Sequence, residues 1–297
     1  MTVTLPSSVR IEPGVGDGDL LVVETPSGTA RIHTYGAHLV SWVPAGGADL
    51  LWVSPRTAYE PGAAIRGGVP LCFPWFGPHP SGTGPAHGFA RVSVWRLVEA
   101  TELPDDATHP GGGVAVTLEL TEQDVDPALT SVWPHPFAAR VRLVVGRELS
   151  LSLAVTNTGG QTFSVSEALH TYVAVGDVRR VIVTGLDGAT YVDKVADDVH
   201  VQVGPVVLDG ETDRVYTGTA ATTQVVEPGR PTVTVAKSGS RSTVVWNPWA
   251  EKAAAMADVP DDAWTGFVCV ETANAFDDSF AVEPGETRTI TARFTVG

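Results

Sequence analysis

Apolar and polar residues alternate along much of the chain. At residues 114–121 and 149–155 every second residue is Val or Leu, and residues 231–235 and 288–296 show a similar alternation. A period of two residues is typical of a strand with one buried face. The pattern therefore predicts many strands, each with one side against a core.

Turn-forming residues separate these segments. Gly146, Arg147 and Glu148 stand between two alternating segments, residues 141–145 and 149–155, which predicts a β-hairpin. The chain holds 31 glycines and 22 prolines, a high share that indicates many turns. Residues 104–113 are polar and glycine-rich, so we expect a surface loop there.

Helical segments are few. Residues 250–258 have helix-forming side chains, but Pro260 ends the segment early, and residues 126–133 suffice for one helical turn. We find no repeat of 20–50 residues and no linker that divides the chain. We therefore expect an all-β protein: one large antiparallel β-sandwich over residues 1–297, with few short helices.

Composition and charge exclude several classes of protein. A hydrophobic content of 43% excludes a disordered chain. Lys and Arg total 19 against 34 Asp and Glu, a formal net charge of −15, so nucleic acid and anionic membranes are not expected as partners. The N-terminus does not resemble a signal peptide, no apolar run is long enough to span a membrane, and the two cysteines make no disulfide scaffold. A cytoplasmic protein is expected.

Motifs for metal ions and nucleotides are weak. His33 and His38 lie five residues apart in what we predict to be one strand, so their side chains would point to opposite faces. His79 and His87 lie in a Gly/Pro-rich loop with no third ligand at a zinc spacing. Neither a phosphate-binding loop nor a nucleophile elbow is present. We therefore expect no metal site and no nucleotide-binding loop.

The most unusual segment is a loop rich in aromatic rings, proline and glycine. It runs through residues 66–77 and 84–91 and carries Arg66, His87 and Arg91. Aromatic faces pack well on sugar rings, and guanidinium groups bind phosphate or carboxylate through paired hydrogen bonds. The segment predicts a binding cleft with an aromatic wall and cationic donors. The alternative is a rigid loop between strands whose Arg91 pairs with an acid.

Three further residues are candidates for acid–base chemistry or hydroxyl binding. Glu271 shares one face of an apolar strand with Cys269, which predicts a partly buried carboxylate with a raised pKa. Asp213 can accept two hydrogen bonds from sugar hydroxyls, and His170 can donate or accept a proton near neutral pH. Each residue also has a simpler interpretation. Glu271 would be a rim residue or a salt-bridge partner, Asp213 a plain loop carboxylate, and His170 a core or surface histidine.

Seven short motifs cover nearly the whole chain and are specific as a set. They are Arg66-Gly-Gly-Val-Pro70, Pro74-Trp-Phe-Gly77, His87-Gly-Phe-Ala-Arg91, Ala168-Leu-His-Thr-Tyr172, Asp213-Arg-Val-Tyr216, Trp246-Asn-Pro-Trp249 and Val268-Cys-Val-Glu-Thr-Ala273. Together they resemble the glucose-6-phosphate 1-epimerases, the hexose-6-phosphate mutarotases of the aldose 1-epimerase superfamily. One departure is Phe73, where many members have Trp.

The resemblance implies a galactose-mutarotase-like β-supersandwich that acts on a phosphosugar without a cofactor. It implies His170 as general acid and Glu271 as general base. It places four residues on substrate-binding positions: Arg66, His87, Arg91 and Asp213. The chemistry agrees, because exchange of the α and β anomers needs a base for the C1 hydroxyl proton and an acid for the ring oxygen.

Three other functions remain as alternatives. An aldose 1-epimerase for unphosphorylated sugars would have no use for two arginines beside the loop. An inert sugar-binding module would not need both His170 and Glu271. A glycoside hydrolase would need a second carboxylic acid, for which Asp213 is a candidate. The expected function is the interconversion of the anomers of a hexose 6-phosphate, with glucose 6-phosphate as the expected substrate.

Overall fold

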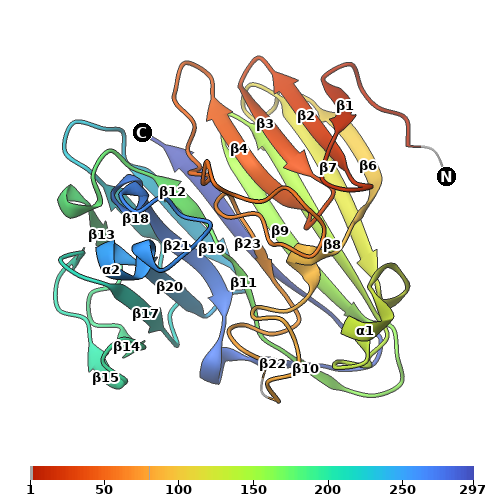
Figure 1. Ribbon diagram of the computed structural model, residues 1–297. Coiled ribbons are helices and arrows are strands. Elements are labelled where there is room, and N and C mark those ends of the chain that lie inside the picture. Colours follow the sequence, from red (N-terminus) through yellow and green to blue (C-terminus); the bar gives the residue numbers. More distant parts are fainter. Residues whose placement is uncertain (1–2, 80) are drawn as a thin grey trace.

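The strands of this protein form two packed layers (Figure 1). The computed structural model describes residues 3–79 and 81–297. Apolar side chains from a four-stranded and an eight-stranded sheet pack against those of a nine-stranded sheet. The four-stranded sheet contains, in spatial order, β1 (Val9–Pro13), β2 (Asp19–Thr25), β3 (Gly28–His33) and β4 (His38–Pro44).

The nine-stranded sheet forms one layer by itself, and its neighbouring strands are all antiparallel. Its strands are, in spatial order, β16 (Val206–Val207), β13 (Ile182–Thr184), β18 (Thr223–Val226), β19 (Val233–Ser238), β23 (Thr287–Val296), β9 (Leu149–Asn157), β8 (Phe137–Gly146), β7 (Gly113–Thr121) and β6 (Arg96–Leu103).

The eight-stranded sheet carries most of the residues that the sequence motifs singled out. Its strands are β15 (Asp198–Val201), β14 (Thr190–Asp193), β17 (Thr212–Tyr216), β20 (Ser242–Asn247), β21 (Phe267–Asn274), β11 (Glu167–Leu169) and β5 (Leu71–Cys72), with β12 (Tyr172–Ala174) paired to β21. A small fourth sheet pairs β10 (Phe163–Val165) with β22 (Phe280–Val282).

The α-helices in the described part of the chain are short: α1 (Pro127–Thr130) and α2 (Trp249–Ala254). The carboxylate of Asp126 caps α1 by accepting a hydrogen bond from the backbone N–H of Ala128 at 2.8 Å. Among these residues no helix has the length and apolar character needed to cross a membrane. Both helical segments lie where the sequence predicted them.

The expected antiparallel β-sandwich is confirmed. The alternating segments at residues 114–121 and 149–155 are β7 and β9, and β8 and β9 form the expected hairpin. One core cluster takes buried side chains from Val9 to Phe294, which supports our proposal that residues 1–297 form one domain.

The prediction of one strand through His33 and His38 is wrong. His33 ends β3 and His38 begins β4, and the two residues lie opposite each other in the pair. Gly36 and Ala37, between them, have positive φ angles of 77° and 44°, which turns the chain back on itself. Across residues 3–79 and 81–297 no three His, Cys, Asp or Glu side chains are grouped so that they could hold a metal ion.

A cluster of aromatic rings supports the loop that carries the motifs. Phe73 and Phe89, from the two halves of that loop, lie 5.3 Å and 5.9 Å from the ring of Phe137 on β8, measured between ring centroids. Trp133 lies 5.6 Å from the same ring. The position of the loop therefore depends on packing against the nine-stranded sheet.

Truncating this cluster should destabilise the protein strongly. Phe137 is 1% exposed, so Phe137→Ala should lower the free energy of unfolding by about 3–5 kcal/mol, the usual cost of a large cavity. Val203 is 86% exposed, and Val203→Ala should change it by less than about 0.5 kcal/mol. Urea unfolding of the wild type and of both variants measures these changes in the free energy of unfolding. Equal free energies for the two variants would show that the aromatic cluster does not stabilise the fold.

Candidate active site

The candidate residues gather on the face of the eight-stranded sheet that points away from the main core. On β21, Val268 and Val270 pack in the main core, whereas Cys269 belongs to a second apolar cluster on the opposite face. Glu271 is two residues from Cys269 and therefore shares that face. This confirms the division of side chains expected from the sequence.

Strand register brings Asp213 into the same region. Asp213 on β17 lies opposite Trp246 on β20, and Trp246 lies opposite Cys269 on β21. Directly opposite residues project from the same face, so Asp213, Trp246 and Cys269 form one row, with Glu271 in the next row. Asp213 was considered as a loop residue from the sequence; in the structure it is a strand residue.

His170 lies against Glu271. It directly follows β11, and its backbone N–H donates to the carbonyl of Pro70 at 3.0 Å. Its Nδ1 is 3.4 Å from Oε1 of Glu271, but the angles do not make a hydrogen bond. The imidazole stacks on the ring of Tyr172, with centroids 4.9 Å apart and planes inclined by 10°. The ring of Trp246 lies edge-on at 5.9 Å.

Burial shifts the pKa values of this pair in opposite directions. Glu271 is 2% exposed and His170 is 8% exposed. Burial, followed by the negative charge of Asp213, raises the pKa of Glu271 well above its ordinary 4.5, and Lys194 and Arg91 partly oppose the rise. Burial, followed by electrostatic repulsion from His87, Arg91 and Arg66 when these groups are protonated, lowers the pKa of His170 well below 6.5.

His87 lies beside His170, with ring centroids 5.9 Å apart. Its Nδ1 accepts a hydrogen bond from the backbone N–H of Gly77 at 3.2 Å and is 3.4 Å from Sγ of Cys72. Burial, with Arg91 as the next cause, lowers the pKa of His87 to about 3. The ring is therefore neutral at pH 7, with its proton on Nε2, where it can donate to a ligand.

Arg66 is held by two neighbours. Its Nε donates to Oδ2 of Asp258 at 2.8 Å, and its Nη1 donates to the hydroxyl of Tyr172 at 3.0 Å. Burial lowers the pKa of Arg66, but Tyr172 and Asp258 outweigh it and the net shift is upward. Arg66 is therefore a fixed cation, and it is connected to His170 through the ring of Tyr172.

Two further cations lie near Glu271 and His170. Arg91 donates from Nη2 to the carbonyl of Ala86 at 2.6 Å. Lys194 forms an ion pair with Asp213, with 2.8 Å between Nζ and Oδ2, and its Nζ is 5.9 Å from the centre of the Phe76 ring. The alternative that Arg91 serves only to pair with an acid has no support, because the described residues provide it with no ion-pair partner.

Aromatic rings gather at the site, but most of them differ from those expected to form the aromatic wall. Phe73 and Trp75 are buried in the main core, and only Phe76 of that segment packs on the face of the site. The remaining rings at the site come from Tyr172, Trp246 and Trp52. The Phe73 departure from the family pattern therefore concerns core packing and lies outside the site.

The sequence analysis missed Lys194 and Asp258 and assigned no role to Tyr172. Lys194 lies between β14 and β15, far along the chain from every motif, and Asp258 follows α2. One signal was available for Lys194, since the chain has only three lysines. The sequence offered no comparable signal for Asp258.

The structure brings together all six residues predicted for the site. A buried carboxyl and a buried imidazole in contact can move two protons on one bound molecule. Three cations and two further carboxylates, Asp213 and Asp258, lie around them. Such groups can bind an anionic, hydroxyl-rich ligand. Cys72 and Cys269 are both free and buried here, and burial raises the pKa of each thiol.

Known proteins resemble this chain over most of its length. The family model for aldose 1-epimerase matches residues 19–295. An Escherichia coli K12 protein named "Putative glucose-6-phosphate 1-epimerase" is 39% identical over 86% of this chain and 83% of its own length. A Cenchrus ciliaris protein of the same name is 35% identical over 89% and 84%.

Solved structures also resemble this chain. A Salmonella typhimurium protein, described as a "putative mutarotase", superposes with a TM-score of 0.88 at 33% identity and covers 100% of this chain and 96% of its own. The expected galactose-mutarotase-like fold is thereby confirmed. The chain belongs to the aldose 1-epimerase family.

Proposed function

We propose that this protein interconverts the α and β anomers of a hexose 6-phosphate, with Glu271 as general base and His170 as general acid. The observation that carries the proposal is the buried pair of these two side chains, 3.4 Å apart, in a chain of the aldose 1-epimerase family. The names of the E. coli and Cenchrus ciliaris relatives support glucose 6-phosphate as the substrate.

The reaction needs one proton to be shared by the pair. In ring opening, Glu271 takes the proton of the C1 hydroxyl while His170 gives a proton to the ring oxygen, and the C1–O5 bond breaks. The aldehyde group then rotates about the C1–C2 bond. The same two transfers in reverse close the ring on the other face. The pair thus changes from carboxylate and imidazolium to carboxylic acid and neutral imidazole, and its total proton count stays constant.

The surroundings of the pair favour this exchange. Burial opposes both charges and favours the neutral form of the pair. Lys194 lowers the pKa of Glu271 and so favours its carboxylate, whereas Arg91 lowers the pKa of both Glu271 and His170. Because the two forms are favoured by opposing effects, they can lie close in energy, which suits a proton that must move both ways.

The cations give a physical basis for binding the phosphate group. The chain has a net charge of −15, so a phosphosugar is repelled at long range. Short, charge-assisted hydrogen bonds from Arg66 and Arg91 would hold the phosphate. Asp213 and His87 would bind sugar hydroxyls. A cytoplasmic location and the absence of nucleic-acid partners remain predictions.

Loss of either catalytic group should remove most of the activity. Wild-type protein should increase the exchange between α- and β-glucose 6-phosphate measured by NMR, and Glu271→Gln and His170→Asn should each lower the rate constant by about 10²–10⁴-fold, the usual contribution of a positioned acid or base. Because the transfers are coupled, the double variant should be little slower than the slower single variant.

The assay separates this mechanism from an inert binding module. Val203→Ala serves as a control, because this exposed side chain lies outside the candidate residues. Exchange no faster than in buffer with wild-type protein would exclude the activity. A single variant that keeps more than about a tenth of the wild-type rate would exclude the role assigned to that residue.

The pH dependence should follow the shifted pKa values. Activity requires one proton on the pair of Glu271 and His170. In acid, kcat should fall when the pair takes up a second proton, at the lowered pKa of His170, which lies well below 6.5. In alkali, kcat should fall when the pair loses its proton, at the raised pKa of Glu271, which lies well above 4.5. Asp213 raises the pKa of Glu271, so Asp213→Asn should move the alkaline limb to lower pH. Wild-type protein and Asp213→Asn are measured in the same buffers, so that ionisation of the substrate phosphate affects both profiles equally. An alkaline limb at the same pH in both proteins would show that Asp213 does not affect the pKa of Glu271.

Arg91 should distinguish phosphosugars from neutral sugars. Arg91→Ala should weaken binding of glucose 6-phosphate by about 1.5–3 kcal/mol, as for a hydrogen bond to a charged group, mainly as a higher KM because the phosphate is remote from C1. The KM for glucose should hardly change. Arg288→Ala, an exposed residue with an ion pair to Glu286, is the control. Equal losses on both sugars would favour an epimerase for unphosphorylated sugars.

A further inference from the structure

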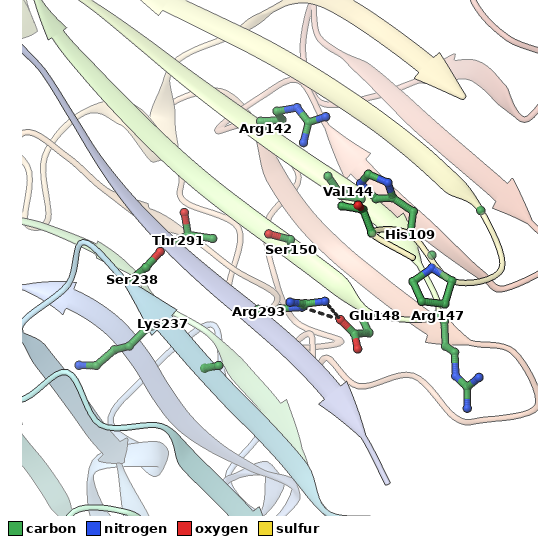
Figure 2. Close-up of a pocket in the computed structure, with 15 residues that line it drawn as sticks. His109, Arg142, Val144, Arg147, Glu148, Ser150, Lys237, Ser238, Thr291 and Arg293 are labelled. Carbon is green, nitrogen blue, oxygen red and sulfur yellow. Dashed lines mark hydrogen bonds and ion pairs between the residues drawn. The ribbon is translucent and has the colours of Figure 1, made fainter. Parts of the chain in front are cut away.

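A cavity of about 460 Å³ lies on the nine-stranded sheet. Its floor includes Val144 and Ser150 on β8 and β9, and Thr291 on β23 (Figure 2). These residues alternate with core residues such as Leu149 and Ile290, so they lie on the outer face of the sheet. The cavity and the candidate active site therefore lie on the outer faces of the two opposite layers.

The floor has hydroxyl groups at its centre and arginines on both flanks. In the register of the sheet, Arg142 on β8 lies opposite Ser152 on β9, and Arg293 on β23 lies opposite Ser150 on β9. Figure 2 shows Arg142 and Arg293 on either side of Ser150. The hydroxyl of Ser152 shares a 2.9 Å hydrogen bond with that of Thr291. Two guanidinium groups can thus approach a ligand from two sides of a hydroxyl-lined strand.

The charge of the cavity is opposite to that of the whole protein. Arg142, Arg147 and Arg293 line it, and Glu148, paired with Arg293, is the carboxylate among the lining residues. In the described part of the chain Arg142 has no ion-pair partner. Lys237 adds little charge to the cavity, because its Nζ donates to the carbonyl of Ser242 and the hydroxyl of Thr243, both at 2.7 Å.

Nearby carboxylates are already engaged elsewhere. Glu119, on the neighbouring strand β7, pairs with Arg96 at 3.0 Å and with Arg140 at 2.7 Å. In the loop that borders the cavity, Asp105 accepts from the backbone N–H of Gly111, and Asp106 accepts from those of Thr108 and His109. These contacts order the loop. Of the two arginines that flank the floor, Arg293 is paired with Glu148, whereas Arg142 has no ion-pair partner among the described residues.

We propose that this cavity is a second binding site, distinct from the candidate active site, for a small compound with several phosphate groups. A volume of about 460 Å³ falls in the range of small-molecule sites, roughly 300–1,000 Å³. Guanidinium groups bind phosphate oxygens through paired hydrogen bonds, and serine and threonine hydroxyls donate to the same oxygens. A ligand with more than one phosphate can contact Arg142 and Arg293 together, one phosphate at each guanidinium group.

Calorimetric titration of the full chain with inorganic tripolyphosphate tests this site. Arg142→Gln should weaken binding by about tenfold or more, since it removes a cation with no competing partner. Glu148→Gln should strengthen binding several-fold, since it removes the carboxylate that lines the cavity and releases Arg293. Arg288→Gln is the matched control, because it makes the same charge change on β23 outside the cavity, and it should leave the affinity unchanged.

Arg91→Ala distinguishes the two sites, because tripolyphosphate could also bind the cations of the candidate active site. The proposal requires that binding at the outer face persists in Arg91→Ala. It is overturned if Arg142→Gln and Arg288→Gln bind equally well, if Glu148→Gln does not strengthen binding, or if Arg91→Ala alone abolishes it. Each variant replaces an exposed or half-exposed side chain, so all should fold; a thermal unfolding curve for each one checks this.

Discussion

The burial of strand β21 on both faces is the constraint on which the site depends. All eight residues of this strand, Phe267–Asn274, are buried. One face packs into the main core through Val268 and Val270, and the other carries Cys269 and Glu271. A carboxyl group on such a strand has lost most of its water, and a shift of its pKa toward the neutral form follows directly.

The residues around Glu271 reflect the cost of burying that group. An unpaired buried carboxylate is strongly unfavourable, and Lys194 and Arg91 supply the opposing charges. Asp213 acts in the other direction, yet it is itself paired with Lys194. The site thus combines burial, which raises the pKa of the carboxyl, with cations that limit the rise. A group in this balance can gain and lose a proton under one set of conditions.

The protein also separates its charges in space. Its net charge of −15 keeps anions away over most of the surface. Five of the 16 arginines lie in two places: Arg66 and Arg91 near Glu271 and His170, and Arg142, Arg147 and Arg293 in the cavity on the nine-stranded sheet. The layers between them are filled by one apolar core. The proposed second binding site and the candidate active site therefore lie on opposite sides of this core.

Local pattern was enough to predict the fold class. The period of two at residues 114–121 and 149–155 identified β7 and β9, and the turn residues between β8 and β9 identified their hairpin. The faces of β21 could also be assigned, because alternation depends only on neighbouring residues. The six candidate residues of the site followed from motifs that resemble those of a known family.

Contacts between distant segments were decided only by the tertiary structure. The sequence placed Phe73 and Trp75 on the wall of the cleft, but the aromatic cluster formed with β8 draws them into the core. His33 and His38 were assigned to one strand, although a turn with positive φ angles separates them. Lys194 and Asp258 reach the site through strand pairing and helix placement. Such contacts depend on how the sheets pack, and no local pattern of hydrophobic and polar residues encodes them.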